Sequence, residues 1–243
     1  MQNLANQHVM IFGASSGMGR EIALACINQN MNVSMCARRT EKLSEMAAWN
    51  QQSIFYDQVD IRDKLNVDNF VNNAVNNYGQ PDYVINCVGV MYYQLMQKKD
   101  YNQWLKMINT NVIGFLNITH AIIDPITYSR GIFINITSDA GRKAFPGLSV
   151  YSGTKAFMEF TLSGLRQELI ASGVRVVNIQ PGNVKTPLQG MSTDKEAEQL
   201  YGSFAYQEFL NPIDVANTVI YAMQQPSHVA MNEILIEPQQ EPI

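Results

Sequence analysis

Short runs rich in β-branched and aromatic residues alternate with longer amphipathic segments along the 243 residues of the chain. Parallel neighbouring strands need a long crossover between them, usually a helix, so this alternation predicts right-handed crossovers and a parallel sheet covered on both faces. This is the doubly wound α/β arrangement, in which ligands bind beyond the carboxyl ends of the strands. The runs expected to be strands are 8–12, 32–36, 53–59, 82–87, 131–137, 174–180 and 231–237.

The length of the chain fits one α/β domain, and no low-complexity linker, composition break or internal repeat divides it. We therefore expect residues 1–243 to form a single domain. The irregular stretch is 187–210, which is rich in Met, Tyr and Phe and precedes a helix opening at Asn211-Pro212. An insertion of this kind is a candidate lid.

Charge gives no reason to expect nucleic acid or an anionic membrane as a partner, because 17 basic side chains face 21 acidic ones. A small molecule is the better expectation. The first residues lack the pattern of a signal peptide and no apolar run approaches the ~18 residues of a membrane span, so a cytoplasmic location is expected. Cys26, Cys36 and Cys87 are odd in number and widely spaced, which favours buried reduced thiols, and the histidines show no metal-ligand spacing.

A glycine-rich turn follows the first predicted strand: Gly13-Ala14-Ser15-Ser16-Gly17-Met18-Gly19. Glycines allow a tight turn and a close backbone approach, and the next helix points its free N–H groups at an anion. The turn is therefore predicted to hold a pyrophosphate. Three residues separate its first two glycines, so the spacing differs from the G-x-G-x-x-G fingerprint.

The second predicted strand leads into Arg38 and Arg39, and no acidic residue stands between Glu21 and Glu41. An acidic side chain at this point would bind the ribose 2′-hydroxyl of NAD, whereas a guanidinium suits a 2′-phosphate. NADP(H) is therefore favoured over NAD(H). The alternative is that both arginines are solvated loop charges.

Tyr151 and Lys155 stand four residues apart at the start of a long amphipathic helix, which places phenol and ammonium on one face. The spacing alone is weak evidence. Ser138 strengthens it, because this residue lies just past the predicted strand 131–137, at a carboxyl end of the sheet.

Taken together, these motifs resemble the short-chain dehydrogenase/reductase family. The resemblance implies a Rossmann-type sheet of about seven parallel strands, a nicotinamide cofactor and a homotetramer or homodimer formed through helices near 102–123 and 151–171. It also implies a catalytic group of Asn111, Ser138, Tyr151 and Lys155. The residues that carry it are Gly13, Gly17, Gly19, Asn86, Gly89, Asn111, Ser138, Tyr151, Lys155, Pro181, Gly182 and Thr186.

Each member of this group has an expected role in reducing a carbonyl to an alcohol or in the reverse reaction. Ser138 would bind the carbonyl oxygen and Tyr151 would donate its proton, with a pKa lowered by the Lys155 ammonium and, in the oxidised complex, by the positive nicotinamide. Lys155 would also hold the nicotinamide ribose, and Asn111 would anchor a water that relays protons. The alternative for Asn111 is an ordinary polar helix residue.

The resemblance assigns further cofactor contacts to three places in the chain. Phe12 stands where the family usually has Thr, and Cys87-Val88 replaces smaller residues, so the local packing must differ. The expected contacts are Asp60 and Ile61 beside the adenine, Asn86 and Gly89 along the ribose, and Pro181, Gly182, Val184 and Thr186 around the nicotinamide.

Apolar residues are candidates for substrate contacts beside Ser138 and Tyr151. Core packing explains such residues equally well, and the substrate's identity is not encoded in a recognisable motif. The candidates are Met91 and Tyr92 after Gly89, Leu188, and the lid residues Met191, Tyr201, Phe204 and Tyr206.

Two other functions are compatible with parts of the pattern. Gly13-Ala14-Ser15-Ser16-Gly17 also fits the G-x-S-x-G nucleophile elbow of hydrolases, with His228 as the later histidine, but this leaves Gly19 and the Tyr151–Lys155 pair unexplained. A non-catalytic sensor that binds NADP(H) is the second alternative. Proteins of that kind usually lose the tyrosine or the lysine, and this chain retains both.

Overall fold

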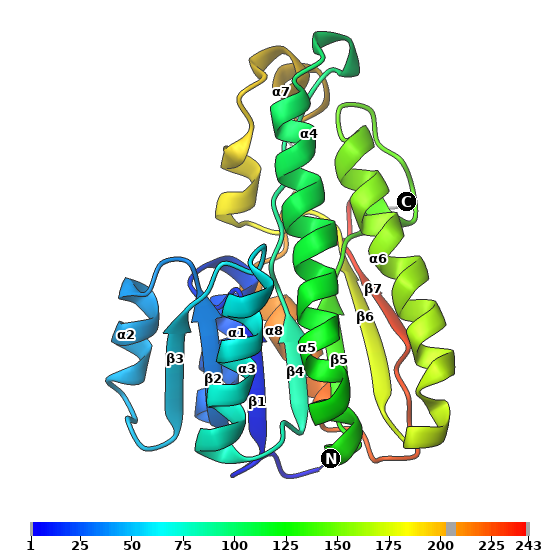
Figure 1. Cartoon of the computed structure of the whole chain (residues 1–243). Helices are drawn as coiled ribbons and strands as arrows, with labels where there is room; N and C mark the ends of the chain where they lie inside the picture. Colours follow the sequence, from blue (N-terminus) through cyan, green and yellow to red (C-terminus); the bar gives the residue numbers. More distant parts are fainter. Residues whose placement is uncertain (1, 203–207, 242–243) are drawn as a thin grey trace.

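The computed structural model describes residues 2–202 and 208–241. Its centre is one parallel sheet in the order β3-β2-β1-β4-β5-β6-β7, with helices on both faces (Figure 1). The predicted doubly wound fold is confirmed, and every predicted strand lies within two residues of the observed one. The strands are β1 His8–Phe12, β2 Asn32–Ala37, β3 Ile54–Gln58, β4 Tyr83–Asn86, β5 Ile132–Ile136, β6 Arg175–Pro181 and β7 Glu233–Ile236.

Two hydrophobic cores form because alternate residues of each strand face opposite sides of the sheet. Val9 and Ile11 of β1 pack with α1 (Gly17–Asn28), α2 (Glu41–Ala47) and α8 (Pro212–Met223). Met10 and Phe12 face the other way. There they pack with α3 (Lys64–Tyr78), α5 (Gly114–Ser129) and α6 (Ser149–Glu168), which lie side by side in front of the sheet in Figure 1.

Phe12 shows how the packing adapts to this departure from the family pattern. Its side chain is fully buried, and its ring meets that of Phe70 on α3 edge to face at 5.2 Å between centroids. An aromatic pair of this geometry adds about 0.5–1.5 kcal/mol to the burial of its area. Phe12 is therefore a core residue of the α3 face.

The order of the strands reverses direction at β1, which pairs with β2 on one side and β4 on the other. In doubly wound sheets the crevice beyond the strand ends at such a switch point receives the ligand. The backbone past Phe12 and Asn86 opens into this crevice. The predicted sites on the glycine turn and after β4 therefore meet here.

The helix that carries Asn111 is irregular. It runs as α4 (Tyr101–Met107), a π-helical segment η2 (Ile108–Ile113) and then α5, drawn in Figure 1 as one long helix rising above the sheet. A π turn adds a residue to a helical turn and is frequent at functional sites. The sequence pattern predicts a helix here and does not reveal the π segment.

The predicted lid contains a short helix, η5 (Pro187–Met191), followed by α7 (Lys195–Tyr201). Its middle is fixed to the loop after β4: the Tyr93 amide donates to Ser192 Oγ at 2.8 Å, and Lys98 pairs with Asp194. The lid and the β4 loop therefore form one layer above the sheet. Phe204 and Tyr206, expected in the lid, lie outside the described residues.

The remaining short helices are η1 (Met96–Lys98), η3 (Asp139–Gly141) and η4 (Ile170–Ser172). Within residues 2–202 and 208–241, no helix combines the length and the apolar content needed to cross a bilayer. The three cysteines are free, with Cys26 and Cys36 buried and Cys87 partly exposed.

Candidate active site

Two cavities share a wall beyond the carboxyl ends of the strands. The larger, of about 580 Å³, runs from the glycine turn over β1, β2 and β4 to α6. The smaller, of about 120 Å³, lies over β5 and β6 and beneath the lid. Tyr151 lines both cavities, as do Met18, Thr137, Thr186 and Leu188. The two cavities therefore meet around the Tyr151 side chain.

The glycine turn forms one end of the larger cavity, and two of its glycines are required by geometry. Gly13 has φ +90°, a conformation that L side chains rarely adopt. At Gly19, a Cβ would stand 2.3 Å from the Gly13 carbonyl oxygen, which excludes any side chain. The α1 helix therefore starts directly against the turn, with its free N–H groups at the cavity.

Basic side chains surround the end of the larger cavity beyond β2. Arg38, Arg39 and Arg62 all line it. Arg62 is already paired, because its Nε donates to Asp60 Oδ1 at 2.9 Å, and this pairing lowers the pKa of the Asp60 carboxyl. Neither Arg38 nor Arg39 forms an ion pair with a described residue. They are the guanidinium groups that an added anion can bind.

Most of the predicted cofactor residues come together in the larger cavity. Asn86 lies below it, where its Oδ1 accepts from the Val88 amide at 3.1 Å and its Nδ2 donates to Asn135, so it supports the turn after β4. Pro181, Gly182 and Val184 line the smaller cavity instead. Those in the larger cavity are Gly13, Ser15, Ser16, Gly17, Met18, Gly19, Arg38, Arg39, Asp60, Ile61, Gly89, Tyr151, Lys155 and Thr186.

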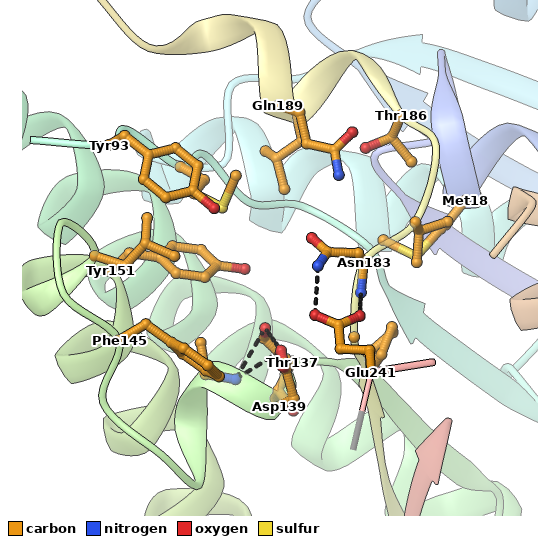
Figure 2. Close-up of a pocket in the computed structure, with 18 of the residues that line it drawn as sticks. Met18, Tyr93, Thr137, Asp139, Phe145, Tyr151, Asn183, Thr186, Gln189 and Glu241 are labelled. Carbon is orange, nitrogen blue, oxygen red and sulfur yellow. Dashed lines mark hydrogen bonds between the residues drawn. The ribbon is translucent and has the colours of Figure 1, made fainter. Parts of the chain in front are cut away.

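Ser138, Tyr151 and Lys155 lie close together at the shared wall. Lys155 Nζ stands 5.7 Å from the centre of the Tyr151 ring and donates to the Ile136 carbonyl at 3.2 Å. The Ser138 hydroxyl donates to Asp139 Oδ1 at 2.8 Å. In Figure 2 the Tyr151 hydroxyl points into the smaller cavity, facing Asn183 and Glu241. These three members of the predicted group thus come from the segment between β5 and η3 and from α6.

Burial dominates the titration of this group. It raises the pKa of Tyr151 above its usual value of 10, and the Ser138 hydroxyl opposes the rise only in part. The lowering expected from the Lys155 ammonium is therefore not found, because desolvation of the phenolate dominates and the charge of Asp139 adds to the rise. Desolvation likewise lowers the pKa of Lys155 from 10.5 to about 8.

Asn111 is 1% exposed and holds the loop after β4. Its Oδ1 accepts from the Val90 amide at 2.9 Å, and its Nδ2 donates to the Val90 carbonyl at 2.9 Å and to Thr154 Oγ1 at 3.0 Å. A Cβ built on Gly89 would lie 3.5 Å from Lys155 Nζ and 3.7 Å from Asn111 Oδ1. Asn111 therefore lies beside Lys155, with Gly89 between them.

The smaller cavity is walled by side chains from separate parts of the chain. Of the predicted substrate residues, Met91, Ser138, Tyr151 and Leu188 line it. Tyr92 does not line it, and the next residue, Tyr93, does, with its hydroxyl turned inward in Figure 2. Of the residues expected in the lid, Tyr201 lines this cavity and Met191 lines the larger one. Lining residues that sequence reasoning missed include Asp139, Phe145, Leu148, Asn183, Gln189 and Glu241.

Glu241 enters the site from the segment after β7. Its Oε2 accepts from the Asn183 amide at 2.9 Å, and its Oε1 accepts from Asn183 Nδ2, as the dashed lines in Figure 2 show. Burial raises the pKa of Glu241, and the charges of Asp139 and Glu237 raise it further. No spacing in the sequence indicates this contact.

The topology excludes the hydrolase alternative. Ser15 follows β1 at the carboxyl end of the sheet, whereas His228 precedes β7 and is exposed. Because all strands are parallel, the residue before a strand lies at the opposite end of the sheet from the residue after one. Ser15 and His228 therefore cannot form a catalytic pair.

Comparison with known proteins identifies the family. A family model described as short chain dehydrogenase matches residues 7–197, which include the glycine turn, Asn111, Ser138, Tyr151 and Lys155. The chain belongs to this family.

Two relatives show the breadth of the short-chain dehydrogenase match. Glycine betaine reductase of Emericella nidulans is 41% identical over 244 residues, covering 99% of this chain but only 19% of that longer protein. An uncharacterized oxidoreductase of Staphylococcus saprophyticus is 35% identical over 243 residues and is covered completely. The chain therefore corresponds to a fifth of the first relative and to the whole of the second.

Solved structures of short-chain dehydrogenases have the same fold. A closed form of serine dehydrogenase complexed with NADP+ superposes with a TM-score of 0.90 at 28% identity, covering 98% of this chain and 97% of that one. Serine dehydrogenase from Escherichia coli gives a TM-score of 0.84 at 27% identity, with 98% and 100% covered.

Proposed function

We propose that the protein is an NADP(H)-dependent oxidoreductase that interconverts a carbonyl compound, ketone or aldehyde, and its alcohol by hydride transfer, with Tyr151 as the general acid and base. The observation that carries the proposal is the place of Tyr151 on the wall shared by the two cavities. A dinucleotide in the larger cavity and a small substrate in the smaller one would then both reach the same hydroxyl.

The larger cavity fits a dinucleotide with a 2′-phosphate. Its volume of about 580 Å³ lies in the range of ligand sites, and the glycine turn presents bare backbone. Arg38 and Arg39 offer guanidinium groups that form no ion pair with a described carboxylate. The serine dehydrogenase that superposes on this chain was solved with NADP+. When bound, the nicotinamide supplies or accepts the hydride.

Tyr151 and Ser138 would manage the proton and the charge on the substrate oxygen. Burial keeps Tyr151 protonated at neutral pH, which suits a general acid for carbonyl reduction. The Ser138 hydroxyl now donates to Asp139, and rotation about its Cβ–Oγ bond would turn it toward a substrate oxygen. Both residues are buried, which restricts their side chains and favours preorganised hydrogen bonds.

Lys155 would exchange protons during this reaction, and Asn111 would hold the loop beside Lys155 in place. With a pKa of about 8, Lys155 can both accept and donate a proton near neutral pH. Asn111 has all three of its observed hydrogen bonds within the protein, to Val90 and Thr154, which fixes the loop beside Lys155. We propose that this loop positions the water through which Lys155 exchanges protons.

Turnover by the wild type and by Tyr151→Phe tests the proposal. Absorbance at 340 nm is followed with NADPH and then NADH across aldehydes, ketones, 3-ketoesters and quinones. Removing the general acid is expected to lower kcat at least about 10³-fold, while NADPH still binds. Tyr128→Phe is the matched control, because that tyrosine is exposed on α5, away from both cavities.

Equal turnover by wild type and Tyr151→Phe would contradict the assigned role. Tight NADPH binding with no turnover of any carbonyl would instead favour the sensor function.

We further propose a homotetramer or homodimer formed through the long helices. Ile113 and Leu116 of η2 and α5, and Phe157 and Phe160 of α6, are exposed, Phe160 to 82%. A shared surface would bury these apolar side chains. Light scattering of wild type and Phe160→Glu tests this, and an unchanged mass would contradict it.

A further inference from the structure

The smaller cavity carries negative charge without a matching cation. Among the residues that line it, the charged ones are Asp139 and Glu241. They come from distant segments, η3 after β5 and the stretch after β7, and Figure 2 shows both beside the space that the Tyr151 hydroxyl faces. Because both carboxylates are negative when ionised, they favour a positively charged ligand in this cavity.

The carboxylates repel one another. Desolvation raises the pKa of Asp139 and that of Glu241, and the charge of Asp139 adds to the rise at Glu241. Glu237, whose side chain lies next to Gly182, adds a third negative charge, and its buried Oε1 has no hydrogen-bond partner among the described residues. A cation placed among these groups would relieve the repulsion.

The basic residues nearest in sequence are Arg142, Lys143 and Lys185, and the exposed Lys185 lines neither cavity. Arg142 donates to Gln180 Oε1 at 3.0 Å and lies 3.9 Å from Glu233, although its charge still reaches Glu237. Lys143 lies over the Phe145 ring, 5.8 Å from its centre, and Lys155 lines only the larger cavity. No lysine, arginine or histidine of the described residues lines the smaller cavity.

The remaining walls also suit a cation. Tyr93, Phe145, Tyr151 and Tyr201 line the cavity. Aromatic faces attract cations, and groups of aromatic rings recognise alkylated ammonium groups in particular. The small volume of about 120 Å³ places any bound group close to the Tyr151 hydroxyl.

We infer that the substrate is a small carbonyl compound or alcohol carrying an ammonium group, which Asp139, Glu241 and the aromatic walls hold beside Tyr151. This inference rests on the proposed function, since it assigns the substrate class of the same site. Asp139 and Glu241 act as specificity-determining residues, and the reacting oxygen is left to Ser138 and Tyr151.

Matched pairs of probes test the charge alone. (Trimethylammonio)acetaldehyde is compared with its neutral isostere 3,3-dimethylbutanal, and aminoacetone with butan-2-one, each with NADPH at 340 nm. The cationic member of at least one pair is expected to have a kcat/KM about tenfold or more above its neutral isostere. Equal or better turnover of the neutral members would overturn the inference and leave the proposed function standing.

Variants assign the preference to the carboxylates. Asp139→Asn keeps an oxygen that can accept from Ser138, and Glu241→Gln keeps one that can accept from the Asn183 amide. Each is expected to reduce the cation-to-neutral ratio of kcat/KM roughly tenfold. Glu45→Gln, an exposed acid on α2, is the control and should retain the wild-type ratio. A ratio unchanged in both cavity variants would overturn the assignment.

Binding gives a readout that does not depend on turnover. Calorimetry on the protein saturated with NADP+ compares choline with 3,3-dimethylbutan-1-ol, which differ in the charge of one central atom. Tighter binding of choline, weakened in Asp139→Asn, supports the inference even where no probe is turned over. Absence of any preference for choline in that case overturns it.

Discussion

The two cavities beside Tyr151 are built in different ways. The larger is lined by the glycine turn, the Arg38-Arg39 stretch and the loop after β4, which follow the ends of the adjacent strands β1, β2 and β4. The smaller is lined by residues from six separate parts of the described chain, from Met18 to Glu241. Backbone shape is set by the fold, whereas each side chain of the smaller wall can change independently.

We therefore expect the larger cavity to be common to proteins of this fold and the smaller cavity to differ between them. The glycine turn tolerates few substitutions, because a Cβ on Gly19 would stand 2.3 Å from the Gly13 carbonyl oxygen. A cavity made of side chains can be re-lined while the sheet stays the same, so it determines the substrate. Substitutions at Gly19, Lys155 and Arg38 test this division, in order from the largest expected effect to the smallest.

Gly19→Ala is predicted to damage the larger cavity most. The new Cβ would stand 2.3 Å from the Gly13 carbonyl oxygen, so the turn or the start of α1 must shift. Overpacking of this kind costs about 3 kcal/mol, and we expect NADPH affinity, measured by calorimetry, to fall roughly 100-fold.

Gly164→Ala is the matched control for this change. Gly164 lies within α6, and a Cβ there meets no atom within 4 Å. Alanine in a helix is favoured over glycine by roughly 0.5–1 kcal/mol, so this variant should be slightly more stable and bind NADPH normally. Equal affinity in both variants would show that the turn adapts, against the division between a fixed and a variable cavity.

Lys155→Met is predicted to change how stability depends on pH. Folding lowers the pKa of Lys155 from 10.5 to about 8, so between these values the unfolded chain binds more protons than the folded one. The stability of the wild type should therefore rise relative to the variant as pH increases through this window. Over the whole window the gain is roughly 3 kcal/mol.

Urea unfolding of both proteins at pH 7 and pH 10, without cofactor, measures this effect. Tyr151 and the buried thiols titrate in both proteins, so the difference between the two isolates the ammonium. A difference that does not depend on pH would mean that Lys155 is solvated in the folded protein.

Arg38→Asp is predicted to alter the choice of cofactor while leaving the chemistry in place. An acidic side chain at the end of β2 repels a 2′-phosphate and can accept from a ribose hydroxyl. A charged hydrogen bond contributes about 1.5–3 kcal/mol, so the NADPH-to-NADH ratio of kcat/KM should fall roughly 10- to 100-fold. The same ratio measured for Arg39→Asp shows how much each arginine contributes to binding the 2′-phosphate. Unchanged selectivity in both variants would contradict the assignment of NADP(H).

The sequence predicts the sheet and most of the larger cavity because their signals are local. Strand patterns, the glycine turn and the Tyr151–Lys155 spacing each lie within a few consecutive residues, and their order along the chain fixes which strand ends they follow. The roles assigned to Asn111, Ser138, Tyr151 and Lys155 stay predictions until variants at these positions are measured.

The smaller cavity is predicted less completely because its contacts are long-range. Glu241 accepts a hydrogen bond from Asn183, which lies 58 positions earlier in the chain, and no sequence pattern near either residue predicts this contact. Tyr92 and Tyr93 are consecutive residues, yet only Tyr93 lines the cavity. The path of the backbone decides which of the two side chains faces it. The lowering of the Tyr151 pKa expected from Lys155 is not found for a related reason, since burial depends on the whole surrounding structure.

The π segment η2 lets the two halves of one long helix, α4 and α5, face different neighbours. A regular helix keeps a fixed phase from end to end, so turning one face toward a neighbour fixes every other face as well. The additional residue in a π turn resets that phase. Through it α4 can face the lid, where Gln103 bonds Thr193, while α5 independently faces α3. A one-residue deletion within η2 would therefore leave the helix continuous but rotate one half against the other, unseating the lid and Asn111 together.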